Sequence, residues 1–255
     1  MLFLFPITSI MPFDNWQILA AGLLAGIILG LSKSGIKGIA MLCVAIMAIT
    51  FSAKASTGIL LPMLIGADVL AVTYYRRHVQ WPYLIKMMPW MMAGVLIGVW
   101  TGNDVSEHIF KQGMSVIILI SVVIMFWWDR SNKNLTNNKL IAPVMGLSAG
   151  FATMVGNLAG AFSNIYFLAM RLPKDQFIGT AAWLFFIINL FKLPFHIWVW
   201  GTITTSSLMT SASLFPGVLI GFFGGVRLVK LIREKRFRQM ILLLTAIGAV
   251  IILIK

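Results

Sequence analysis

Long uninterrupted apolar runs are the feature that most constrains this chain. Hydrophobic residues fill 60% of its 255 positions and charged residues only 11%, whereas soluble domains carry roughly 25% charged residues. A soluble fold of this length cannot bury so much apolar surface. The runs are continuous rather than alternating, which argues against a transmembrane β-barrel. The sequence therefore predicts an all-α, polytopic membrane protein embedded in a lipid bilayer.

The apolar runs divide into two sets of five, separated by a polar stretch at 129–139 that is rich in Asn and Lys. The runs of the first set cover 15–31, 38–51, 55–75, 83–101 and 109–128, and those of the second cover 140–155, 160–170, 176–200, 208–226 and 237–254. We therefore expect a first transmembrane repeat over 1–128, a cytoplasmic linker at 129–139 and a second repeat over 140–255.

Matching motifs in the same order indicate that the two halves are duplicated. GLLAG at 22–26 matches GLSAG at 146–150, and GVLIG at 94–98 recurs unchanged at 217–221. Glycines spaced four apart let helix backbones approach closely in lipid, so we expect these motifs to pack helix against helix. The shared order, more than any single match, predicts an internal repeat.

The first two runs of each half are short for a membrane span. At 1.5 Å per residue, runs of this size reach about 21–25 Å, against a hydrocarbon core of about 30 Å. We expect each pair to form a helical hairpin that is re-entrant rather than fully spanning. The tips of these hairpins would lie at 32–38 and 156–160.

The net charge of +13 predicts topology rather than a nucleic-acid partner, because cytoplasmic loops of membrane proteins collect Lys and Arg. The connection at 226–238, the RRH sequence at 76–78 and the linker are basic, whereas the loop at 102–107 is acidic and the one at 201–207 is uncharged. Equivalent loops of the two halves then face opposite sides of the membrane. This pattern predicts an inverted repeat with both termini on the outer side of the membrane.

The two hairpin tips are candidate anion-binding elements. Where a helix restarts, its first amides have no partner and its dipole end is positive, so a small oxyanion fits there, with hydroxyls and lysines as further donors. The candidate substrate contacts are Ser32, Lys33, Ser34, Gly35, Lys37 and Gly38 in the first tip, and Gly156, Asn157, Gly160 and Asn164 at the second. Two alternatives stay open: the lysines mark the cytoplasmic surface, and the polar residues bond neighbouring helices.

Four further polar residues interrupt the apolar runs. Asp68 lies mid-segment and is a candidate coupling residue for a proton or cation, or one half of a structural ion pair. Asn189 is its counterpart in the second half. Lys192 and His196 lie toward the end of their run, where Lys192 either contacts an anion on its path or snorkels to the interface.

Signatures of catalysis are missing from the sequence. It contains no G-x-S-x-G, H-E-x-x-H or P-loop motif, its three histidines lack metal-ligand spacing, and its one cysteine is Cys43. We expect no enzyme, no metal and no cofactor. Without an ATPase domain, transport would run on a gradient or on a partner protein.

Three features together resemble the sulfite exporter TauE/SafE (TSUP) family: the G-x-x-x-G-x-x-x-G run at 22–30, the sequence ADVLAVTYYRRHVQW at 67–81 and the two-half duplication. The resemblance implies a secondary transporter that exports sulfite, a sulfonate or a similar sulfur-containing anion across the bacterial inner membrane, so that the outer side on which both termini lie would be the periplasm. The alternatives are a gated anion channel and a non-transporting membrane assembly subunit.

Overall fold

The computed structural model describes residues 15–36, 38–102, 105–110, 112–114, 116–117, 120, 138–233 and 236. Within these ranges the structure is helical and has no β-strand. The first half contains α1 (Trp16–Lys33), α2 (Ala40–Phe51), α3 (Ala53–Tyr75), the 3₁₀ turn η2 (Arg76–His78) and α4 (Trp81–Gly102). The second half contains α6 (Ile141–Gly156), α7 (Gly160–Ala169), α8 (Lys174–Pro194), the π-helical turn η3 (Phe195–Val199) and α9 (Thr205–Leu231).

Five of these helices are long and apolar enough to cross a membrane, which confirms the all-α membrane prediction for the described part of the chain. They are Trp16–Lys33, Ala53–His78, Trp81–Gly102, Lys174–Val199 and Thr205–Leu231. The shorter apolar helices include α2 and α6, with 12 and 16 residues. The tenth expected segment, 237–254, and most of the fifth, 109–128, lie outside the described residues.

Local hydrogen bonds explain where several helices begin. The side chain of Asn15 accepts a hydrogen bond from the Gln17 amide at the start of α1, and Thr204 and Ser207 form a reciprocal capping box at the start of α9. These side chains replace the missing partners of the first helical amides. The start of α3 is capped by a residue that is distant in the sequence. A Glu107 carboxylate oxygen accepts a hydrogen bond from the Ala53 amide at 2.5 Å.

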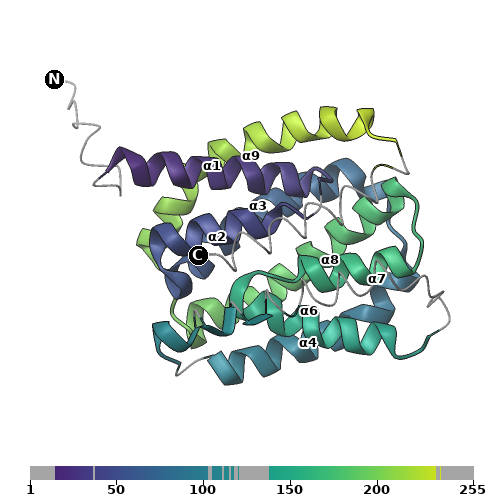
Figure 1. Cartoon of the computed structure of the whole chain (residues 1–255), viewed down its shortest axis with the longest axis horizontal. Coiled ribbons are helices and arrows are strands. Elements are labelled where there is room, and N and C mark those ends of the chain that lie inside the picture. The colour runs from purple at the N-terminus through teal and green to yellow at the C-terminus, as the bar shows by residue number, and fades with distance from the viewer. Residues whose placement is uncertain are drawn as a thin grey trace.

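Two helix pairs, each joining the two halves, form opposite sides of the bundle (Figure 1). Helix α1 packs along α9 and α4 packs along α6, with α3 and α8 between the pairs. The glycine motifs make these contacts: a Cβ added at Gly30 would lie 2.1 Å from the Val218 carbonyl oxygen, and one at Gly150 would lie 1.9 Å from that of Met91. The expected packing role of the glycines is thus confirmed. Only residues without a side chain allow such close backbone approach.

The central helices α3 and α8 contact each other along antiparallel directions. Gly58, near the start of α3, lies against Thr202 beyond the end of α8, while Gly179, near the start of α8, lies against His78 beyond the end of α3. Helix α2 lies against α1 and α3, and α7 lies against α6 and α8. The α1–α2 and α6–α7 connections, where the predicted tips are, therefore both border the central pair.

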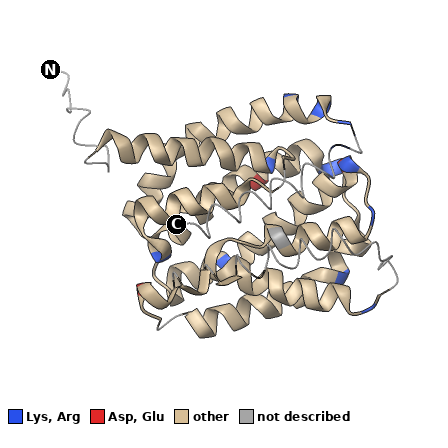
Figure 2. Ribbon diagram, in the orientation of Figure 1, with Lys and Arg blue, Asp and Glu red and all other residues tan. Residues whose placement is uncertain are grey.

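Most basic side chains gather at one end of the helices (Figure 2). This end, called the basic end below, contains η2, the start of α8 and the end of α9. It is held together by Lys174, whose ammonium donates to the Val229 and Ile232 carbonyl oxygens. The other end, called the opposite end below, contains the start of α3, the loop at 201–204 and the start of α9.

Candidate substrate site

The first predicted tip is a tight buried turn between α1 and α2. Gly35 and Gly38 have φ angles of 124° and 101°, a region that L side chains rarely adopt, so this turn requires glycine at both positions. The hydroxyl of Tyr75, at the end of α3, donates to the Ser34 carbonyl oxygen at 2.6 Å. Lys37 lies outside the described residues.

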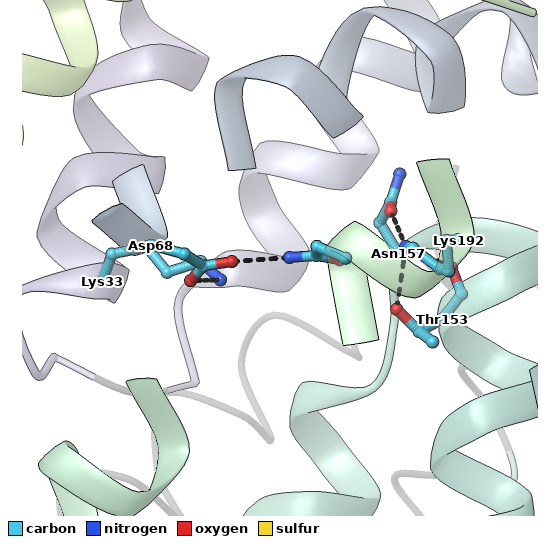
Figure 3. A network of polar contacts seen from close by, with 6 residues as sticks. Lys33, Asp68, Thr153, Asn157 and Lys192 are labelled. Atoms are coloured by element: carbon cyan, nitrogen blue, oxygen red, sulfur yellow. Dashed lines mark hydrogen bonds and ion pairs between the residues drawn. The ribbon is translucent and has the colours of Figure 1, made fainter. Parts of the chain in front are cut away.

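Lys33 is buried and forms an ion pair in the centre of the bundle. Its ammonium lies 2.5 Å from Asp68 Oδ1, and the Asn189 side-chain amide donates to Asp68 Oδ2 at 2.6 Å. Figure 3 shows the Lys33–Asp68 pair beside a second group of polar contacts around Lys192. The interpretation of Lys33 as a surface topology signal is therefore wrong, and the alternative of an ion pair for Asp68 is realised.

Lys192 is fully buried, so its interpretation as a residue that snorkels to the interface is also wrong. Its ammonium donates to the Thr153 carbonyl oxygen and hydroxyl, each at 3.0 Å, and to Asn157 Oδ1 at 2.6 Å (Figure 3). All three acceptors are neutral. They replace water around the ammonium but do not neutralise a positive charge.

A cavity of about 50 Å³ lies where the two tips meet. A few ordered waters or one small oxyanion fit a space of this size, which polar and apolar residues line together. Its lining includes the predicted residues Ser32, Lys33, Gly38, Asn157, Gly160, Asn164 and Asn189, together with Ala40, Met41, Leu64, Thr153, Leu158, Ala159 and Phe185. Residues of both predicted tips thus line one cavity.

The helix starts at both tips lie beside this cavity. Helices α2 and α7 begin at Ala40 and Gly160, both of which line it, and neither start is capped by a side-chain hydrogen bond. A Cβ added at Gly160 would meet nothing within 4 Å. The uncapped first turns of two helices therefore supply partial positive charge to the same space.

The side chain of Asn164 has a polar atom without a hydrogen-bond partner among the residues that the structure describes. The side chain is buried, lines the cavity and leaves its Oδ1 without a hydrogen bond there. Buried polar atoms are almost always paired in folded proteins, so an unpaired amide beside a cavity marks a place where a ligand or water completes the bonding.

Other predicted residues lie near the cavity without lining it. Ser34 and Gly35 belong to the first tip but face Tyr75 and Ile178, and Gly156 faces Leu158. Asp68 and Lys192 do not line the cavity, but each forms hydrogen bonds to residues that do. Asp68 bonds to Lys33 and Asn189. Lys192 bonds to Thr153 and Asn157. His196 is buried in η3, just beyond the end of α8, and its Nδ1 lies 2.8 Å from the Thr202 hydroxyl.

The sequence analysis missed two residues of the site. Thr153 solvates Lys192, and the Phe185 ring lies 4.6 Å below the Lys33 ammonium in a cation–π contact. The position of Thr153 in the last turn before the second tip was the available signal. Phe185 gave none, because it is one aromatic residue among many in an apolar run.

Basic groups outnumber acidic ones among the buried residues of the site. Among the residues described, Lys33 and Lys192 are buried lysines and Asp68 is the buried carboxylate. Uncompensated charge is expensive inside a membrane. The described residues contain no group of three or more His, Cys, Asp or Glu side chains placed to hold a metal ion.

Comparison with known proteins agrees with this chemistry. The family model for the sulfite exporter TauE/SafE family matches residues 18–252. No curated protein and no solved structure matches the chain. Because the family match covers nearly the whole length, including both tips and the central helices, the chain belongs to the sulfite exporter TauE/SafE family of membrane transport proteins.

Proposed function

We propose that this protein is a secondary transporter that exports a small sulfur-containing anion, such as sulfite or a sulfonate, across the bacterial inner membrane. The observation that carries the proposal is the excess of buried positive charge, with Lys33 and Lys192 against Asp68, around a cavity where two uncapped helix starts converge. The family match supports a sulfur-containing anion as the substrate class.

The anion would lie between the tips, in contact with Lys33 and the α2 start on one side and with Asn157, Gly160 and Asn164 on the other. Lys33 is shared between the cavity and Asp68. An anion that draws the Lys33 ammonium away removes a cation from the side of Asp68, which favours proton uptake by its carboxyl group. Asp68 is thereby the coupling residue of the proposed cycle.

Alternating access would come from two inverted repeats, 1–128 and 140–255, joined by a cytoplasmic linker. The cross-pairing of α1 with α9 and of α4 with α6, and the antiparallel contact of the equivalent helices α3 and α8, support this arrangement. In such a protein one bundle rocks against the other around a central site. The basic end would face the cytoplasm, and both termini the periplasm.

Reconstitution into liposomes tests the function directly. Labelled sulfite, sulfate, thiosulfate and taurine are offered with and without a pH gradient, and we expect saturable, gradient-dependent flux of at least one of them. Lys33→Gln and Lys192→Gln remove a cation beside the site, and each lowers flux roughly tenfold or more, the scale of a lost charge-assisted hydrogen bond. Lys86→Gln, which changes an exposed lysine at the start of α4, is the matched control and keeps flux.

The alternatives predict different results. A gated anion channel gives flux that does not saturate with anion concentration. Its flux follows the electrical driving force and is not coupled to the pH gradient. A non-transporting assembly subunit moves none of the anions above the rate of empty liposomes, and the lysine variants then change nothing. Either result contradicts the proposal.

A further inference from the structure

A second, larger cavity lies at the opposite end of the bundle, where α3 and α9 begin. Its volume is about 580 Å³, and we call it the outer vestibule. Its walls carry many hydroxyl groups and one charged residue of each sign: Ser52, Thr202, Thr204, Ser206, Ser207 and Thr210, with Lys54 and Glu107. Glu107 is held at the α3 start, where its carboxylate accepts from the Ala53 and Lys54 amides. The lysine and hydroxyl donors suit a hydrated anion.

A chain of buried polar residues connects the outer vestibule to the central cavity. Thr202 lines the vestibule, and its hydroxyl lies 2.8 Å from His196 Nδ1. Lys192, in the last turn of α8, precedes His196, in the π-helical turn η3, by four residues. The Lys192 ammonium bonds to Asn157 and Thr153, which both line the central cavity.

The second tip also contacts the vestibule wall from its other side. The Asn157 amide donates to the Thr57 carbonyl oxygen at 3.4 Å, and Thr57 lies on α3 between Ala55 and Ile59, which line the vestibule. Asn157 therefore touches the central cavity, Lys192 and the vestibule wall. Breaking its two hydrogen bonds would open a route between the two spaces.

His196 has the features of a residue on such a route. Its side chain is fully buried, and its Nε2 has no hydrogen-bond partner among the residues that the structure describes. It lies in the π-helical turn η3, and π-turns within helices occur frequently at functional sites. The Trp200 ring, which also lines the vestibule, covers it edge to face at 5.2 Å between ring centroids.

Resting on the proposed function, we infer that the outer vestibule is the exit chamber for the anion, and that Asn157, Lys192 and His196 form the barrier between it and the central cavity. The anion replaces Asn157 and Thr153 as a partner of Lys192, and then passes the unpaired Nε2 of His196. The barrier opens when the second tip moves away from Thr57 and Lys192.

Neighbouring cysteines provide the test. Ser206→Cys places a thiol in the vestibule, whereas Thr205→Cys, next to it, is exposed outside the lining. Both are made in a Cys43→Ala background, which removes the single native cysteine. The detergent-solubilised variants are modified with an anionic sulfonatoethyl or a cationic trimethylammonium-ethyl methanethiosulfonate, then reconstituted, and anion flux is measured.

We expect the anionic adduct at Ser206→Cys to lower flux roughly tenfold, the effect of a like charge beside the path in a partly screened medium. The cationic adduct at the same position lowers it less, and neither adduct at Thr205→Cys changes it. His196→Gln lowers the maximal flux rate and leaves the half-saturating anion concentration unchanged, because His196 does not line the central cavity.

The two proposals fail in distinguishable ways. If the unmodified protein shows no flux, the transport function itself is wrong and the exit route falls with it. If flux is normal and saturable but both Ser206→Cys adducts leave it intact, the vestibule is not on the path and the transport function stands. Equal inhibition by the two adducts contradicts a path selective for anions.

Discussion

Lys33 and Asp68 lie 35 residues apart in the sequence, and their side chains form a buried ion pair with a 2.5 Å contact. The same separation joins Asn157 to Lys192, which bond at 2.6 Å. In each half a residue at the hairpin tip is thus connected to the central helix that follows it. The first half uses a cation and a carboxylate for this connection, and the second uses an amide and a cation. The site therefore contains two lysines and one carboxylate.

Breaking the Lys33–Asp68 pair from one side should destabilise the protein strongly. Lys33→Met leaves the Asp68 carboxylate buried without its cation, which costs about 3–5 kcal/mol in comparable buried pairs. The double variant Lys33→Met/Asp68→Leu removes both charges and should recover much of the loss. Thermal unfolding in detergent measures both, and a double variant less stable than Lys33→Met would show that the pair is not the source of the effect.

The glycines of the two helix pairs should tolerate no side chain. Gly30→Val and Gly150→Val place atoms inside the van der Waals radius of the facing carbonyl oxygens, so they separate the helices and lower the melting temperature or abolish folding. Gly224→Ala is the control, because a Cβ there meets nothing within 4 Å. It should stabilise the helix by about 0.8–1.0 kcal/mol through propensity alone. Equal behaviour of Gly30→Val and the control would contradict the packing.

Solvation of the Lys192 ammonium by Thr153 gives a third prediction. Thr153→Val keeps the shape of the side chain and removes one acceptor, so the variant should lose about 1–3 kcal/mol of stability and part of its anion flux. Thr101→Val is matched to it, since that exposed hydroxyl bonds only to carbonyl oxygens of its own helix. It should change stability by less than about 0.5 kcal/mol. Chemical denaturation in detergent compares the two.

The proposed sidedness can be read from single cysteines placed at exposed positions of the two ends. In intact cells of the Cys43→Ala variant, an impermeant thiol reagent should label Ser106→Cys and Thr204→Cys from outside. His78→Cys and Asn138→Cys should react only after the membrane is opened. The basic end faces inward in this arrangement. Labelling of His78→Cys in intact cells would reverse the topology and the proposed direction of the exit route.

Helix positions were predictable from the sequence because apolar runs report them directly. The run at 83–101 became α4 (Trp81–Gly102), and the run at 15–31 became α1 (Trp16–Lys33). The boundaries of these helices differ from the runs by up to two residues. At the start of α3, which precedes the run at 55–75 by two residues, a tertiary contact caps the helix: Glu107, distant in sequence, accepts hydrogen bonds from the Ala53 and Lys54 amides.

The depth of the charged side chains was harder to predict. Lys33 was interpretable either as a surface signal or as an anion ligand, and Lys192 as an interface residue, because a single sequence shows which residues are charged but not what surrounds them. Their burial depends on partners from other helices, namely Asp68 for Lys33 and Thr153 with Asn157 for Lys192. Those partners become visible only when α1, α3, α6 and α8 are assembled.

The sequence alone determined that the chain is a helical membrane protein with packing glycines and two candidate tips, because hydropathy and residue spacing act locally along each segment. Only the tertiary structure decided that the tips share one cavity and that two lysines flank it with one carboxylate. These features depend on contacts between different helices, from 35 residues apart for Lys33 with Asp68 to 121 for Asn189 with Asp68. Local patterns carry no information about which of the buried polar groups in an apolar chain become partners.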